Sequence, residues 1–196
     1  EIVVSLNRWE QSKDETPFAI KTIQAEQVLR YNPQTTADLV RQKGGVFIQK
    51  SQMGGGSPMI RGFSANRLLI VIDGVRLNNA IYRNGNLHNI ISLDAAGTSS
   101  AEIIFGPGSV IYGSDALGGV MSFNALKPKL TTTAVYEHSG KVLTRFSSAN
   151  FEKTVNATYN FGSKKWAAVV NATFTDFDDL RMGSRGPDEY LRPDFV

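Results

Sequence analysis

The sequence predicts an α+β domain, with a small mixed sheet and short helices, followed by long antiparallel strands. Up to about Leu126, short apolar blocks are separated by glycine-rich turns and by two helical patches. After Lys127-Pro128-Lys129 the pattern changes to long segments in which apolar and polar residues alternate. We therefore expect two structural regions, 1–126 and 127–196.

The composition excludes several classes of protein. A chain of 196 residues with 41% hydrophobic residues can bury a sizeable core, which excludes overall disorder. The formal charge is only +3 and the basic residues are scattered, so we expect no nucleic-acid partner. The absence of cysteine excludes disulfides and thiolate metal sites. No apolar run approaches the roughly 18 residues of a membrane-spanning helix.

Two helices are predicted in the first region. One begins near Thr35 or Thr36, whose hydroxyl can cap it, and ends at Gly44-Gly45, where glycine tolerates a left-handed conformation. A shorter helix covers Ala25 to Arg30, and Pro33 limits its extension.

Continuous apolar runs predict buried strands. Leu68 to Asp73 is such a run, and the turn signal Asp73-Gly74 closes it. Ala101 to Phe105 and Gly119 to Phe123 have the same character. The segment Ser51 to Pro58 is too rich in glycine for an element interior and is predicted to be a loop.

The second region contains strands with strict alternation. Thr154 to Phe161 and Trp166 to Phe174 each place apolar residues on one face, and Gly162 to Lys165 joins them as a hairpin. Gly140 to Ser148 precedes them and alternates less cleanly. Strands of about 9 to 11 residues with aromatic residues near their ends are typical of an outer-membrane barrel wall. A soluble antiparallel sheet has the same period, so the alternation leaves both interpretations open.

The sequence lacks the constellations of an enzyme or a metal site. Gly108 and Gly113 have the spacing of a phosphate-binding loop, but Ser114 and Asp115 follow where a lysine is required. The two histidines, His88 and His138, lie far apart, and no nucleophile motif accompanies them. We therefore predict no catalytic residues, no metal site and no cofactor, with coordination of haem iron by His88 as an alternative to a surface histidine.

Four blocks in order resemble the plug of TonB-dependent receptors: Met59 to Phe63, Leu69 to Arg76, Phe105 to Pro107 and Tyr112 to Val120. The opening segment 1–11 resembles the TonB box and following residues of such proteins, the cobalamin receptor included. The segment 173–187 is similar to early barrel strands of haem and siderophore receptors.

This resemblance implies a plug folded inside a barrel of about 22 strands in the outer membrane of a Gram-negative bacterium. The expected organisation is a TonB box at 1–6, a plug domain at 7–126 and the start of a transmembrane β-barrel at 127–196, with about three strands and an incomplete loop. Because three strands cannot close a barrel, we hypothesise that the sequence is a truncated or partly represented receptor.

The resemblance also implies roles for particular residues. The TonB box would add as a strand to the sheet edge of TonB through the residues Ile2, Val3, Val4, Ser5 and Leu6. The loops at 52–57 and 78–89 would contact substrate, with these candidates: Gln52, Met53, Gly54, Gly55, Tyr82, Arg83 and His88. Arg61 and Glu102 are expected to anchor the plug to the barrel. Phe105 replaces an arginine that is usual in the family, which puts the usual plug–barrel charge cluster in doubt.

The function that follows is TonB-dependent transport of a scarce nutrient, an iron complex such as a siderophore or haem. Its partners would be TonB with its inner-membrane energising complex, the nutrient and outer-membrane lipid. One alternative is a soluble periplasmic module that binds a partner through its N-terminal strand. Another is a hydrolase or nucleotide-binding enzyme, for which the sequence offers no nucleophile beside a base.

Overall fold

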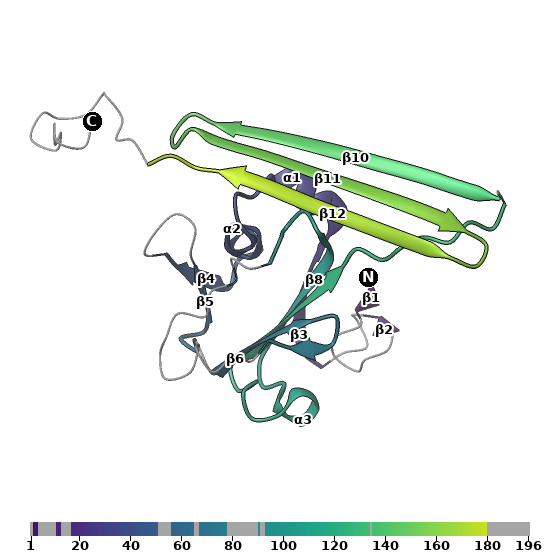
Figure 1. Ribbon diagram of the computed structural model, residues 1–196. Helices are drawn as coiled ribbons and strands as arrows, with labels where there is room; N and C mark the ends of the chain where they lie inside the picture. The colour runs from purple at the N-terminus through teal and green to yellow at the C-terminus, as the bar shows by residue number, and fades with distance from the viewer. Residues whose placement is uncertain are drawn as a thin grey trace, which may run out of the picture. The chain divides into compact units, whose positions relative to one another are not determined.

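The computed structural model describes residues 17–50, 56–64, 67–77, 90, 93–133 and 135–179, and the backbone of 2–3 and 11–12. It divides into two compact units, residues 1–127 and 128–196 (Figure 1). Among the described residues, no helix combines the length and apolarity needed to cross a membrane.

A five-stranded mixed sheet forms the centre of the first unit. Its strands lie in the order β3-β8-β9-β6-β7. Only the pair β6–β9 is parallel. The bounds are Ala19–Gln24 for β3, Leu68–Ile72 for β6, Val75–Arg76 for β7, Thr98–Phe105 for β8 and Gly119–Ala125 for β9. The three predicted buried strands are thus confirmed, whereas β3 was not predicted.

Both faces of this sheet are buried, and a separate apolar cluster packs on each face. On one face, Ile103, Met121 and Phe123 pack with side chains from the helices α1 (Ala25–Tyr31) and α2 (Thr36–Arg41). On the other face, Ile104 and Val120 pack against the short helix α3 (Ser109–Tyr112). Burial on both faces explains why the central strands are continuous apolar runs.

The predicted cap of α2 is confirmed, whereas the C-terminal ends differ from the prediction: α2 ends at Arg41, before Gly44, and α1 ends at Tyr31, one residue beyond Arg30. The Thr35 hydroxyl caps α2 by accepting a hydrogen bond from the Asp38 backbone N–H at 3.3 Å, and Gly44 after the helix has φ of 67°. Helix α1 ends at Asn32, which adopts a left-handed φ of 44° directly before Pro33. The helix α3 was not predicted, because its four residues follow Gly106-Pro107-Gly108, which reads as a turn.

A separate two-stranded hairpin consists of β4 (Val46–Gln49) and β5 (Ser57–Ile60). The predicted loop from Ser51 to Pro58 is therefore too long at its C-terminal end, since Ser57 and Pro58 belong to β5. Proline is tolerated there because a strand in a two-stranded sheet is an edge strand. At the N-terminus, β1 (Ile2–Val3) pairs antiparallel with β2 (Gln11–Ser12).

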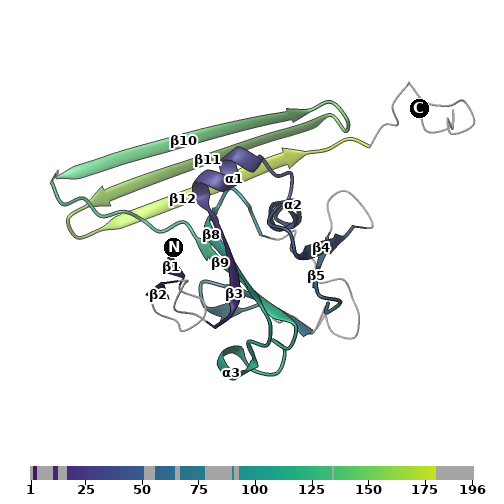
Figure 2. The same ribbon diagram turned by 180° about the vertical axis from the view of Figure 1, so that it is seen from behind.

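The second unit is an antiparallel sheet of three long strands, β10 (Tyr136–Ser147), β11 (Glu152–Ser163) and β12 (Ala167–Asp176). Figures 1 and 2 show them side by side. The hairpin between β11 and β12 is confirmed, but its turn begins after Ser163, because Gly162 and Ser163 pair with β10 and belong to β11. Strand β10 begins four residues before the predicted Gly140, because residues 136–139 pair fully with β11.

Candidate functional site

The segment that carries the first predicted substrate residues starts and ends against α2. At its start, the Lys50 ammonium forms an ion pair with Asp38 of α2. At its end, Gly56 approaches α2 so closely that an added Cβ would lie 2.8 Å from the Ala37 Cβ and 2.8 Å from Ile48 Cγ2. Only glycine permits this approach. The described residues on either side of 51–55, Lys50 and Gly56, thus both contact α2.

The same helix also contacts a residue that follows the second predicted substrate segment. The Thr36 hydroxyl at the start of α2 donates a hydrogen bond to the Leu93 carbonyl. At the other end, the Leu77 backbone N–H donates to the Ile70 carbonyl of β6 at 2.8 Å. The scaffold of both segments is therefore α2 together with the central sheet, a rigid support of the kind on which binding loops are usually carried.

The predicted substrate-contacting residues themselves lie outside the described residues: Gln52, Met53, Gly54, Gly55, Tyr82, Arg83 and His88. Their contacts with a ligand remain a prediction. Within the described part of the chain, no group of three or more His, Cys, Asp or Glu side chains is placed to hold a metal ion.

Two residues of the predicted TonB-binding segment, Ile2 and Val3, form the short strand β1. The backbone of Ile2 pairs with Ser12 and that of Val3 pairs with Gln11. Val4, Ser5 and Leu6 lie outside the described residues. A strand of two residues contributes few hydrogen bonds, so its separation from β2 requires little free energy.

The two predicted anchoring residues occupy different environments. Arg61 is exposed in a tight turn after β5, with φ of 49°, and Gly62 follows with φ of 83°. Glu102 is only 3% exposed and lies in the middle of the central sheet, between Thr22 of β3 and Ser122 of β9. Glu102 thus belongs to a row of buried polar residues across three strands. The Arg61 side chain lies at the surface, outside this row.

Phe105, which stands where an arginine is usual, is 8% exposed and belongs to the core beneath the helices. The Lys21 ammonium lies 5.5 Å from the centre of its ring and donates hydrogen bonds to the carbonyls of Lys43 and Gly44 after α2. A cation–π contact and two carbonyl bonds therefore hold a positive charge beside this position. The sequence contained no local signal for it, because Lys21 and Phe105 are brought together only by the pairing of β3 with β8.

One face of the second unit is apolar and exposed. Seven large side chains on this face are between 46% and 71% exposed: Tyr136, Val142, Phe146, Val155, Tyr159, Val170 and Phe174. The strand register places them on the same face, since Val155 lies opposite Phe174 and Tyr159 lies opposite Val170. An exposed apolar patch of this extent indicates contact with another apolar phase or protein.

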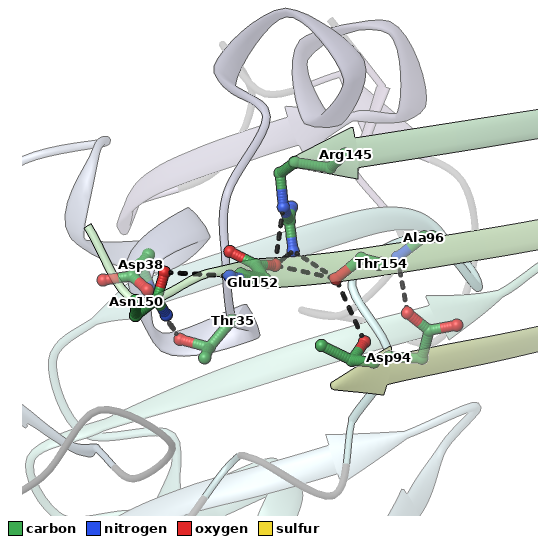
Figure 3. Close-up of polar contacts among 9 residues, drawn as sticks. Thr35, Asp38, Asp94, Ala96, Arg145, Asn150, Glu152 and Thr154 are labelled. Carbon is green, nitrogen blue, oxygen red and sulfur yellow. Dashed lines mark hydrogen bonds and ion pairs between the residues drawn. The ribbon is translucent and has the colours of Figure 1, made fainter. Parts of the chain in front are cut away.

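The opposite face carries polar side chains that are hydrogen-bonded to one another in groups. The Arg145 Nε donates to Glu152 Oε1 at 2.8 Å, and the Thr154 hydroxyl donates to the same oxygen at 2.7 Å (Figure 3). Further along, the Asn156 amide donates to Asn171 Oδ1 at 2.9 Å. Glu152 is 2% exposed as a side chain, so its charge depends on these partners.

The segment that enters the second unit is fastened to this polar face. The Lys129 backbone N–H donates to Asn160 Oδ1 at 3.0 Å, and the Thr131 N–H donates to the Ser163 carbonyl at 3.3 Å. Gly162 makes the crossing possible, because a Cβ there would lie 2.3 Å from the Lys129 carbonyl oxygen. This role of Gly162 was not predicted, because the sequence pattern placed it in the hairpin turn; in the structure it lies within β11, where a glycine marks a close backbone approach.

Comparison with known proteins follows this division of the chain. A family model described as TonB-dependent Receptor Plug Domain matches residues 12–120. The vitamin B12 transporter BtuB of Vibrio vulnificus strain CMCP6 is 31% identical over 159 residues, which are 79% of this chain and 24% of that protein. The chain thus spans about a quarter of the length of this curated relative.

Solved structures share the fold. The pyoverdine outer-membrane receptor FpvA of Pseudomonas aeruginosa superimposes with a TM-score of 0.72 at 18% identity, over 90% of this chain and 24% of that one. The alcaligin outer-membrane receptor FauA of Bordetella pertussis gives a TM-score of 0.67 at 16% identity, over 91% of this chain and 30% of that one. At such identities, these likenesses establish the fold alone.

Proposed function

The chain belongs to the family of TonB-dependent receptor plug domains, and from this premise we propose that the protein carrying it takes up a scarce nutrient through the outer membrane of a Gram-negative bacterium. The fold is that of a receptor plug followed by the first barrel strands. The family is one of transport receptors and not of enzymes. We infer that the plug closes the lumen of the barrel.

The observation that carries this proposal is the two-sided character of the sheet β10-β11-β12. Its exposed face holds side chains such as Val142 and Phe174, which are both 71% exposed. Burying a large apolar side chain is worth about 1.5–3 kcal/mol, so lipid contact would stabilise this face strongly. The other face is polar and internally hydrogen-bonded, which suits a water-containing lumen.

Coupling to TonB is proposed for Ile2, Val3, Val4, Ser5 and Leu6. The pairing of β1 with β2 supports the proposal, because it gives this segment the extended backbone that strand addition to a partner requires. Substrate binding would release the segment, and its backbone hydrogen-bonding groups would then pair with the sheet edge of TonB.

Deletion of residues 1–6 tests this coupling. We expect the truncated receptor to bind nutrient at the cell surface with unchanged affinity and to lose uptake of the labelled nutrient. Val3→Pro, which removes a backbone donor, should act in the same direction, and Val3→Ile serves as the matched control. Uptake that persists in both the deletion and Val3→Pro would contradict the coupling role.

The nutrient is proposed to be an iron complex, a siderophore or haem, that contacts the two segments whose flanking residues contact α2. A corrinoid is the second candidate, because the relative that is 31% identical is a vitamin B12 transporter. Uptake of labelled cobalamin, a labelled ferric siderophore and haem by cells producing the full receptor separates these candidates. If the nutrient is haem, we expect the absorbance spectrum of receptor-bound haem to differ between the unaltered receptor and His88→Ala. An unchanged spectrum would contradict coordination of haem iron by His88.

Anchoring of the plug is proposed for Arg61 and Glu102. Exposure leaves the Arg61 guanidinium able to reach a carboxylate of the barrel wall, whereas the buried Glu102 would act by ordering the centre of the sheet. A soluble periplasmic module remains the competing proposal. Partitioning decides between them, since a protein that is freely soluble in its complete form would favour the module.

A further inference from the structure

A groove lies at the end of the second unit where β11 turns into β12. Its volume is about 510 Å³. Its lining is mainly apolar and aromatic and includes two lysines; the lining residues are Val135, Tyr136, Phe161, Ser163, Lys164, Lys165 and Trp166. Tyr136 and Phe161 belong to the apolar face of the sheet, with ring centres 5.9 Å apart. The groove therefore opens on the face proposed to contact lipid.

The turn that shapes this groove is held by one side chain. The Ser163 hydroxyl accepts hydrogen bonds from the backbone N–H groups of Trp166 at 2.9 Å and Lys165 at 3.3 Å, and it donates to the Trp166 carbonyl at 3.0 Å. One donor and two acceptors use the full capacity of a hydroxyl group. The backbone at Lys165 and Trp166 is thus held in place before any ligand arrives.

The chemistry of the groove combines positive charge with an apolar surface. Lys164 and Lys165 are both exposed, and Trp166 is 78% exposed. Glu137, the acidic residue of β10 at this end, lies opposite Gly162 and so belongs to the polar face of the sheet. Within the part of the chain that the structure describes, neither Lys164 nor Lys165 forms an ion pair with a carboxylate.

We propose that this groove binds an anionic phospholipid. The phosphate contacts Lys164 and Lys165, and the upper part of an acyl chain lies on the rings of Tyr136, Phe161 and Trp166. A free phosphate would leave the aromatic side chains exposed to water. A zwitterionic lipid would bring its own ammonium towards the lysines, and the like charges would repel each other. Aromatic residues that border a membrane-facing surface are typical of the headgroup level, where such a lipid is found.

The size of the preference follows from the two charges. A lysine near an anionic membrane surface contributes about 1 kcal/mol, which is about a five-fold change in affinity. Two lysines together correspond to a roughly 25-fold preference for phosphatidylglycerol over phosphatidylethanolamine. This inference rests on the proposed function, because the groove must lie at a membrane.

The test titrates the full-length receptor in detergent with each of these two lipids and counts bound lipids by native mass spectrometry. We expect one phosphatidylglycerol to bind more tightly than phosphatidylethanolamine, and Lys164→Gln with Lys165→Gln to abolish that difference. Trp166→Ala should weaken both lipids. Lys153→Gln, which removes a lysine from the same face at the other end of β11, is the matched control and should change neither.

Two results would overturn the inference: equal binding of the two lipids to the unaltered receptor, or displacement of phosphatidylglycerol by millimolar inorganic phosphate, which would indicate a free-anion site. Failure of the proposed function looks different. In that case the protein would not partition into membranes and would not show the heat-modifiable migration of a folded barrel. A receptor that is folded and membrane-embedded but has no lipid preference would contradict this inference alone.

Discussion

The crossing of the entry segment over Gly162 can be tested by adding one methyl group. In Gly162→Ala, the new Cβ would lie 2.3 Å from the Lys129 carbonyl oxygen, a separation that backbone atoms cannot accept. The segment must therefore move away from β11. It would lose the bonds from the Lys129 N–H to Asn160 at 3.0 Å and from the Thr131 N–H to the Ser163 carbonyl at 3.3 Å.

The magnitude follows from those two bonds. Each contributes about 0.5–1.5 kcal/mol net, so the change should cost about 1–3 kcal/mol locally. Amide hydrogen exchange reports such local opening, and we expect exchange at residues 129 and 131 to accelerate about 5- to 140-fold. The measurement is hydrogen–deuterium exchange of the detergent-solubilised receptor, read on peptides that cover this segment.

A second glycine in the same sheet supplies the control. At Gly140 an added Cβ would lie 3.7 Å from the Thr158 carbonyl oxygen, which is an ordinary contact. Gly140→Ala should therefore leave exchange at residues 129 and 131 unchanged. Equal exchange rates in Gly162→Ala and the unaltered receptor would refute the reasoning, since they would show that the segment does not cross β11 at this point.

Three further predictions concern interactions within each unit. Phe123→Ala removes a ring that is 2% exposed and should lower the free energy of unfolding by about 3–5 kcal/mol, which lost exchange protection in β9 would show. In the control Val110→Ala, at a side chain that is 97% exposed, the free energy of unfolding should change by no more than about 0.5 kcal/mol. Asn156→Ala removes the amide that donates to Asn171 Oδ1 and to the Thr173 hydroxyl on β12, and it should lower the free energy of urea unfolding by about 1–3 kcal/mol; an unchanged midpoint would argue against the network. Thr35→Ala removes the cap of α2 at a cost of about 1 kcal/mol, and undiminished protection of α2 would contradict that role.

The local elements of both units were predictable because their signals lie within a few residues. The Thr35 hydroxyl caps the start of α2, Gly44 follows shortly after its last residue, Arg41, and the alternation from Thr154 onwards lies within β11. A helix cap and a period of two are properties of the backbone and its nearest side chains. They need no knowledge of distant contacts.

Strand β3 shows where such signals end. The residues Ala19 to Gln24 carry no clear pattern of their own, and they form a strand because each one pairs with β8, about eighty residues away. The same pairing places Lys21 over Phe105 and buries Glu102 beside Thr22. Such contacts depend on which strands meet, and that choice is made by the packing of the whole sheet.

By itself, the sequence determined the two-part organisation, the helices α1 and α2, the apolar strands and the family resemblance, since the signals for all of these lie in neighbouring residues. Only the tertiary structure decided that α2 contacts residues flanking both candidate substrate segments, that Gly162 lets the entry segment cross β11, and that Ser163 shapes a groove whose lining includes Lys164 and Lys165. Contacts of this kind join residues that are remote in the chain, and they exist only once the entropy of closing the intervening loops has been overcome by burial and hydrogen bonding.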